Sequence, residues 1–242
     1  PDDAGGLVDL VDGVLDRMER DEAFTFFHLD GQTIVLRDYL EIRPDQEARL
    51  RRRIAEGRLL VGPWYVMPDM FLVSGEALVR NLALGHRIAE SFSAVMRAGY
   101  LPDPFGHVAQ MPQILAGFSL DNAILWRGFG GPRAEYWWEG HDGRRTLLLH
   151  LPREGYCNAF RLPLLADDAR ASAVAEVLAR EISRTSAGAV LLMAGGDPVP
   201  AHLAFAAIAG APWLLTLLFP RELTVACLAR EASSERVAAG DA

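Results

Sequence analysis

Residues 99–107 read GYLPDPFGH, and this stretch says most about the fold. Its apolar beginning predicts a short buried strand that ends at Pro102. Proline fixes its own φ and disfavours the helical region for the residue before it, so Asp103, which lies between Pro102 and Pro104, is expected to be extended and rigid. A rigid carboxylate suits a nucleophile or a metal ligand. The alternative is a turn in which Asp103 caps a helix that begins near Gln110.

The rest of the chain alternates between helical patterns and apolar runs. Helices are predicted where apolar residues recur every three or four positions, over residues 7–20, 45–57, 76–98 and 168–183. Ser74 is expected to cap the third of them and Gly99 to end it. Strands are predicted over residues 24–29, 59–66, 122–126, 146–151 and 189–193. Continuous apolar runs separated by helices indicate parallel strands, so we expect an α/β fold, open or closed into a barrel.

Polar residues follow several of these strands at the point where each one ends. Asp103 follows the first strand described, Arg127 ends the run from Asn122, and Asp197 follows the run that ends at Met193. In α/β folds the loops at the carboxyl ends of parallel strands converge on one face. We therefore expect Asp103, Arg127 and Asp197 to share one rim.

Two carboxylates on one rim are the minimum for cleaving a glycosidic bond, and phosphoryl or metal-hydrolase chemistry could use the same pair. Taken alone, Asp103 is explained at least as well as an ordinary turn residue, Asp197 is explained better as one, and Arg127 is explained equally well as a structural ion pair. Trp64 could stack on a sugar ring, as could the pair Trp137-Trp138, although aromatic residues beside strands more often belong to the core. The six histidines show no pair at metal-ligand spacing, so no complete local metal site is visible.

The composition excludes several other classes of function. Arginine supplies all 24 positive charges and the net charge is −8, which is a poor footprint for nucleic acid. The one dense basic cluster, residues 49–53, falls in a helical pattern with Glu47 and Glu56 and is interpreted as a solvated helix face. The apolar run 213–219 is too short to span a membrane. No signal peptide and no cysteine framework are recognised, so the expected location is the cytoplasm.

Several motifs in one order resemble a known family. They are HLDGQ at 28–32, DYLEIRP at 38–44, GPWYV at 62–66, PD at 68–69, FLVSGE at 71–76, RNL at 80–82, GYLPDPFGH at 99–107 and QMP at 110–112. Together they resemble the N-terminal catalytic domain of bacterial glycoside hydrolase family 38 α-mannosidases. The likeness is dense over residues 15–158 and resumes at 191–197.

The resemblance implies a retaining exo-α-mannosidase with a zinc-dependent site on an irregular (β/α)7 barrel. The aspartate of the family's Asp-x-Phe-Gly-His motif, which is both nucleophile and zinc ligand, matches Asp103. Phe105 matches the phenylalanine that lines the sugar site, and Arg127 matches an arginine that contacts the reacting region. Asp197 is the best match for the acid/base carboxylate. The implied substrate is an α-mannoside or oligosaccharide, with no nucleic-acid or membrane partner.

The chain also departs from the family pattern. The His-x-His-x-Asp strand that opens the family and the later histidine ligand have no match, so Asp103 is the one expected zinc ligand present. We expect an incomplete barrel over residues 1–200 and a weakly matching tail over 201–242. Two alternatives follow: a truncated barrel without metal site or activity, and, less favoured, a metal-dependent deacetylase, which would need a histidine pair near the aspartate.

Overall fold

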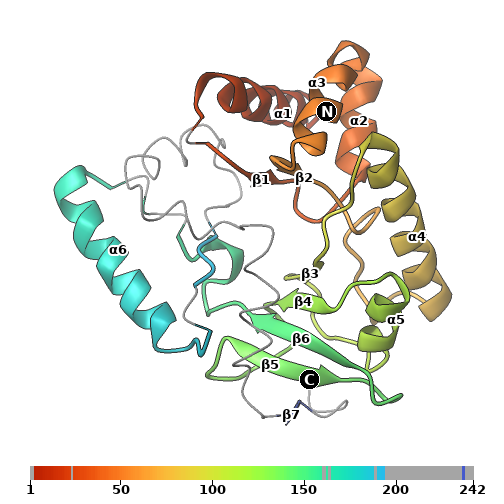
Figure 1. Cartoon of the computed structure of the whole chain (residues 1–242), viewed down its shortest axis with the longest axis vertical. Helices are drawn as coiled ribbons and strands as arrows, with labels where there is room; N and C mark the ends of the chain where they lie inside the picture. Colours follow the sequence, from red (N-terminus) through yellow and green to blue (C-terminus); the bar gives the residue numbers. More distant parts are fainter. Residues whose placement is uncertain are drawn as a thin grey trace.

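The computed structural model describes most of the first 193 residues: 3–22, 24–159, 162, 165–187 and 190–193, together with 236–237. Figure 1 shows three N-terminal helices gathered at one end of the molecule and the main sheet at the other. No helix among these residues has both the length and the apolar character that crossing a membrane requires.

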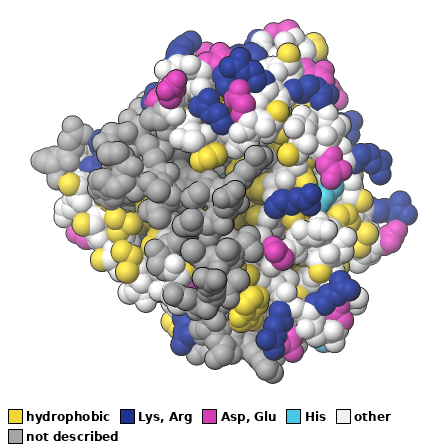
Figure 2. Space-filling view, in the orientation of Figure 1, with side chains coloured by type: hydrophobic (Ala, Val, Ile, Leu, Met, Phe, Trp, Pro, Cys, Tyr) yellow, Lys and Arg dark blue, Asp and Glu magenta, His cyan; other side chains and the backbone are white. Residues whose placement is uncertain are grey.

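The N-terminal helices are α1 (Asp3–Arg20), α2 (Ile34–Ile42) and α3 (Glu47–Ala55), with the 3-10 turn η1 (Pro44–Gln46) before α3. The apolar stripe of α1 packs against α2 and α3, and its buried side chains include Val11, Val14, Leu15 and Met18. The opposite faces are charged, and Figure 2 shows basic and acidic side chains interspersed over this end. The basic cluster of residues 49–53 is ion-paired with carboxylates at Asp16, Glu19, Glu47 and Glu56. A face neutralised in this way gives no basic surface for phosphate binding.

The main sheet has the strand order β3-β4-β6-β5-β7. The strands are β3 (Gly99–Leu101), β4 (Asn122–Leu125), β5 (Glu135–Glu139), β6 (Arg145–His150) and β7 (Arg236–Val237). Strands β3, β4 and β6 are mutually parallel, and β5 is antiparallel to β6. This confirms the α/β class and the parallel arrangement of β3 and β4, the two strands that precede Asp103 and Arg127.

A second, two-stranded parallel sheet pairs β1 (Phe27–His28) with β2 (Leu59–Leu60). Residues that flank it reach the main sheet or its approach: the Met96 amide, before β3, donates to the Val61 carbonyl at 2.8 Å, and Trp64 Nε1 donates to the Tyr100 carbonyl in β3 at 3.0 Å. The described residues form no closed barrel, so the expected (β/α)7 closure is not confirmed.

The remaining helices are α4 (Gly75–Phe92), α5 (Met111–Gly117), the 3-10 turn η2 (Gly155–Cys157) and α6 (Asp167–Ile182). Ser74 caps α4 as predicted, because its Oγ accepts a hydrogen bond from the Ala77 amide. The expected end of this helix near Ala98 is wrong. Its backbone breaks at Ser93, which has φ 156°, and the apolar stripe continues through Met96, which is buried from a loop instead.

Three further expectations need correction. The strands predicted over 24–29 and 59–66 are only two residues long each. The run predicted as a strand over 189–193 is not one within its described part, residues 190–193. There the Asn158 side chain bonds both the Leu191 carbonyl and the Met193 amide, which satisfies the backbone without a neighbouring strand.

Candidate active site

The carboxyl ends of β3, β4 and β6 form one edge. Leu101 pairs with Leu125, and Leu125 pairs with His150, so the three strands end level with one another. Asp103 lies two residues beyond β3 and Arg127 two residues beyond β4. The predicted rim is therefore confirmed for this pair, since parallel strands of matched register bring their following loops together.

Asp103 and Arg127 face each other across this edge. Arg127 Nε lies 3.3 Å from Asp103 Oδ1, and the two side chains are 40% and 41% exposed. The Arg127 amide also donates to the Pro102 carbonyl at 3.0 Å, which ties the two loops together directly before the carboxylate. Within the described chain Asp103 makes no hydrogen bond or ion pair apart from the one with Arg127, so its exposed side remains open to a ligand.

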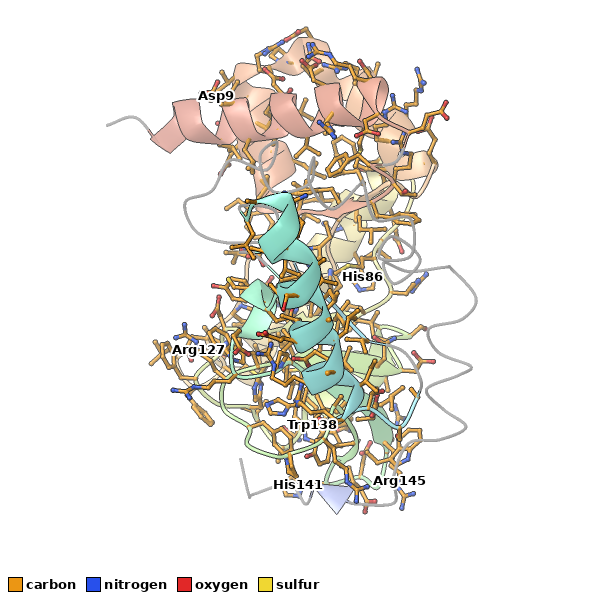
Figure 3. The ribbon with its side chains drawn as sticks, turned by 90° about the vertical axis from the view of Figure 1, so that its left-hand side faces the viewer. Asp9, His86, Arg127, Trp138, His141 and Arg145 are labelled. Atoms are coloured by element: carbon orange, nitrogen blue, oxygen red, sulfur yellow. The ribbon has the colours of Figure 1, made fainter. Side chains whose placement is uncertain are left out.

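Two aromatic rings hold the Arg127 guanidinium in place. Its Cζ lies 4.7 Å from the Trp126 ring centroid and 5.2 Å from that of Phe105. Phe105 is 71% exposed, which is unusual for a phenylalanine and leaves one face of its ring open beside Asp103. The predicted site residues Asp103, Phe105 and Arg127 are thus brought together. Figure 3 shows Arg127 projecting at the edge of the molecule.

Glycines allow the loops to approach this closely. Gly128 has φ +73°, and a Cβ there would lie 2.7 Å from the Gly106 Cα, so the loops after β3 and β4 touch backbone to backbone. A Cβ at Gly106 would lie 1.9 Å from the Phe71 ring. Neither position has room for a side chain, which explains the glycine of the PFGH segment.

His107 fixes the backbone of the arginine from inside the protein. Its Nε2 lies 2.8 Å from the Arg127 carbonyl, which can only accept, so Nε2 carries the proton. The ring is buried against Trp138, with centroids 5.7 Å apart. Burial lowers the pKa of His107, which keeps it neutral and in this tautomer. His107 therefore positions Arg127.

Two residues at the edge of the site were given no role by the sequence reasoning. Tyr100 on β3 is buried, and its ring stacks edge-on against His28 at 4.5 Å. Burial, and then the charges of Asp30 and Asp103, raise the pKa of Tyr100, so its hydroxyl stays protonated and donates to Asp30. Asp30 follows β1 with φ 45° and also accepts from Gln32 at 3.1 Å. A carboxylate followed by glycine directly after a strand is the signal that could have identified it.

The structure places Trp64 differently from its predicted sugar-facing role. Its side chain is 0% exposed and packs in the core, with Nε1 bonded to the Tyr100 carbonyl. No face of the ring is open to a ligand there, because the residue joins the two sheets. Of the pair Trp137-Trp138, the other platform considered, Trp138 is buried and Trp137 is half-buried.

The remaining predicted residue, Asp197, lies outside the described residues, as does most of the 201–242 tail. The capping alternative for Asp103 finds no support. Helix α5 has Gln110 at its N-cap position without a side-chain cap, and Asp103 instead pairs with Arg127.

The described residues do not by themselves fit a zinc ion. No group of three or more His, Cys, Asp or Glu side chains in the described ranges is placed to hold a metal. Structural and catalytic zinc sites need three or four protein ligands. Of the zinc ligands that the family resemblance implies, the described residues contain Asp103, whose carboxylate is paired with Arg127.

Comparison with known proteins identifies the family to which the chain is similar. The family model described as "Glycosyl hydrolases family 38 N-terminal domain" matches residues 6–207. Over 210 residues the chain is 38% identical to a protein of Halalkalibacterium halodurans described as "Putative mannosylglycerate hydrolase", a match that covers 80% of this chain and 23% of that protein. Human "Alpha-mannosidase 2C1" is 31% identical over 150 residues, covering 59% of this chain and 14% of that protein.

Solved structures give the same result. An α-mannosidase from Enterococcus faecalis V583 superposes with a TM-score of 0.81 at 32% identity, covering 91% of this chain and 27% of that chain. A second Enterococcus faecalis structure, described as a protein in the glycosyl hydrolase family 38, gives a TM-score of 0.69 at 33% identity and covers 90% of this chain and 23% of that one. The chain thus spans about a quarter of the length of these relatives.

Proposed function

The chain belongs to glycosyl hydrolase family 38, and from this premise we propose that it forms part of the catalytic domain of an enzyme that hydrolyses terminal α-mannosides. One observation supports the proposal most: an exposed carboxylate at the carboxyl end of a parallel strand, 3.3 Å from an arginine held between two aromatic rings. A partly exposed carboxylate with a fixed orientation suits attack on an anomeric carbon.

We propose a retaining double displacement. An Asp103 oxygen attacks the anomeric carbon and forms an ester while the bond to the leaving oxygen breaks and that oxygen takes a proton from Asp197. Asp197 then removes a proton from water, whose oxygen bonds to the anomeric carbon as the ester bond breaks. Arg127 holds Asp103 in line for the first step, and Phe105 offers an open apolar face to the C–H side of the sugar.

Zinc is the cofactor that the family resemblance implies, with Asp103 among its ligands. The described residues supply only this one carboxylate, and therefore the steps above use protein groups alone. Metal binding is proposed only for a protein that also contains the remaining ligands. The competing proposal is a truncated barrel that neither binds zinc nor hydrolyses mannosides.

The site geometry says less about the leaving group of the substrate than about the sugar. One relative is named for mannosylglycerate, in which the leaving group carries a carboxylate, while others are named simply as α-mannosidases. The Arg127 guanidinium favours an anionic leaving group as one candidate, because arginine recognises planar carboxylates well.

The test is hydrolysis of an aryl α-mannoside by the native protein with added zinc, compared with Asp103→Asn. We expect the wild type to turn over and Asp103→Asn to lose activity by about a thousandfold or more, as nucleophile removals do. Asp38→Asn is the matched control, because Asp38 is exposed on α2 away from the rim. Equal activity in wild type and Asp103→Asn would refute the proposal, as would an inactive, fully zinc-loaded wild type.

A further inference from the structure

The turn after β1 places a second carboxylate, Asp30, against Tyr100 of β3. Asp30 has φ 45° and Gly31 has φ 68°, so two successive residues adopt the left-handed region. Gly31 lies on the Tyr100 ring, because a Cβ there would be 2.7 Å from Tyr100 Cδ1. Residues other than glycine adopt this region rarely, and such conformations cluster at functional sites. The tight contact with Tyr100 therefore fixes the turn that carries the Asp30 carboxylate.

Two donors orient the Asp30 carboxylate. The Tyr100 hydroxyl donates to it, and Gln32 Nε2 donates to Asp30 Oδ2 at 3.1 Å. The Gln32 amide is itself oriented, because its Oε1 accepts a hydrogen bond from the Met67 amide at 2.9 Å. Asp30 is nevertheless an exposed residue, and a carboxylate can accept about four hydrogen bonds. The carboxylate is thus held in one orientation and can still accept a hydrogen bond from a ligand.

Tyr100 connects Asp30 with the nucleophile proposed above. It belongs to β3, and Asp103 lies two residues beyond the end of that strand. Burial raises the pKa of Tyr100, and the charges of Asp30 and then of Asp103 raise it further. Because the interaction between charges weakens with distance, both carboxylates lie near the Tyr100 hydroxyl. The ring is buried and packs edge-on against His28 at 4.5 Å, so Asp30 and Asp103 are held near one immobile phenol.

We propose that Asp30 binds a hydroxyl group of the mannosyl ring while Asp103 attacks the anomeric carbon. The inference rests on the proposed α-mannosidase function and adds a residue that recognises the sugar. An oriented carboxylate accepts a charge-assisted hydrogen bond from a hydroxyl, and such bonds are about twice as strong as neutral ones. Tyr100 acts as a positioning residue, because its hydroxyl holds Asp30 in place.

The experiment removes the carboxylate and the sugar hydroxyls in turn. We measure kcat/KM for an aryl α-mannoside and for the deoxy analogues that each lack one hydroxyl of its mannosyl group, with the native protein, Asp30→Asn and Tyr100→Phe. Asparagine adopts the left-handed region as readily as aspartate, so Asp30→Asn preserves the turn. The control is Asp121→Asn, the same charge change at an exposed residue before β4, at the opposite end of that strand from Arg127.

We expect Asp30→Asn to lower kcat/KM for the parent mannoside by about tenfold, the usual size of one charge-assisted hydrogen bond. With one deoxy analogue, wild type and Asp30→Asn should differ by less than about twofold, because the contact is then missing from both. Tyr100→Phe should show a smaller loss that disappears with the same analogue, and Asp121→Asn should match wild type.

A purely structural role for Asp30 gives a different result, in which Asp30→Asn loses the same factor on the parent and on every analogue. That result, or full activity of Asp30→Asn, overturns the sugar contact, while hydrolysis of the aryl α-mannoside by the wild type still supports the proposed function. Failure of the wild type to hydrolyse any α-mannoside overturns both.

Discussion

Arg127 Nε and Asp103 Oδ1 lie 3.3 Å apart although the residues end different strands, and this pairing defines the chemistry of the rim. It depends on the parallel register of β3 and β4 and on the hydrogen bond from the Arg127 amide to the Pro102 carbonyl. Both features are backbone properties, so the arrangement exists before any ligand binds. Preorganisation of this kind lowers the cost of reaching the transition state.

Arg127 can be tested as an orienting group. Arg127→Gln removes the charge that faces Asp103, and we expect kcat/KM for an aryl α-mannoside to fall by about tenfold to a hundredfold. Arg127→Lys keeps the charge but loses the planar stack between Trp126 and Phe105, so it should recover only part of the activity. Full activity in both variants would exclude this role. Arg80→Gln, a change on the exposed face of α4, is the control.

Gly155 should be essential for stability at the site. Gly155→Ala puts a methyl group 2.4 Å from the Trp126 ring at φ +59°, and we expect it to lower the free energy of unfolding by about 3 kcal/mol. Gly143→Ala is the matched control, because Gly143 has φ +77° with nothing within 4 Å, so it should lose only about 1 kcal/mol of backbone strain. Urea unfolding of both variants measures the difference. Equal losses would mean that contact with Trp126 is unimportant.

His28 should make the protein less stable in acid. Burial lowers the pKa of His28 from 6.5 to about 4. Although the residue as a whole is half-buried, its Nδ1 is shielded from water and has no partner among the described groups. The unfolded chain therefore takes up a proton at a higher pH than the folded one. Full stability is present above pH 6.5 and is lost as the pH falls toward 4, by about 3 kcal/mol from this group.

The measurement is the free energy of unfolding at several pH values between 7 and 4 for wild type and His28→Phe. The variant should show a shallower pH dependence, while His141→Gln, on the exposed turn between β5 and β6, should follow the wild type. Identical slopes for His28→Phe and wild type would contradict the assignment. The buried His86, His107 and His150 also have lowered pKa values, so some acid sensitivity should remain in the variant.

Much of this site could be predicted from the sequence because its information is local. The prolines around Asp103 restrict its backbone, and apolar runs before Asp103 and Arg127 identify parallel strands whose ends meet. The family motifs added Phe105. The partner carboxylate Asp197 stays a prediction, since it lies outside the described residues.

Other features depend on packing that a single sequence does not encode locally. Trp64 resembles an exposed platform in sequence, yet its Nε1 joins two sheets across 36 positions. Strand β5 contains two tryptophans and reads as a ligand surface, but Trp138 is buried and Trp137 is half-buried. The apolar spacing of α4 continues as far as Met96, although the helix ends at Phe92. Met96 is buried as well, but it lies in the loop that follows the helix, so the spacing alone does not show where the helix ends.

Attack of Asp103 on the sugar would leave an ester that can be trapped and identified. The native protein is incubated with a fluorinated α-mannosyl fluoride that reacts but is released slowly, and its peptides are analysed by mass spectrometry. We expect one added fluorinated hexosyl group on the peptide that contains Asp103 and none on the same peptide of Asp103→Asn. Attachment to another carboxylate, or unlabelled protein that still hydrolyses α-mannosides, would contradict attack by Asp103.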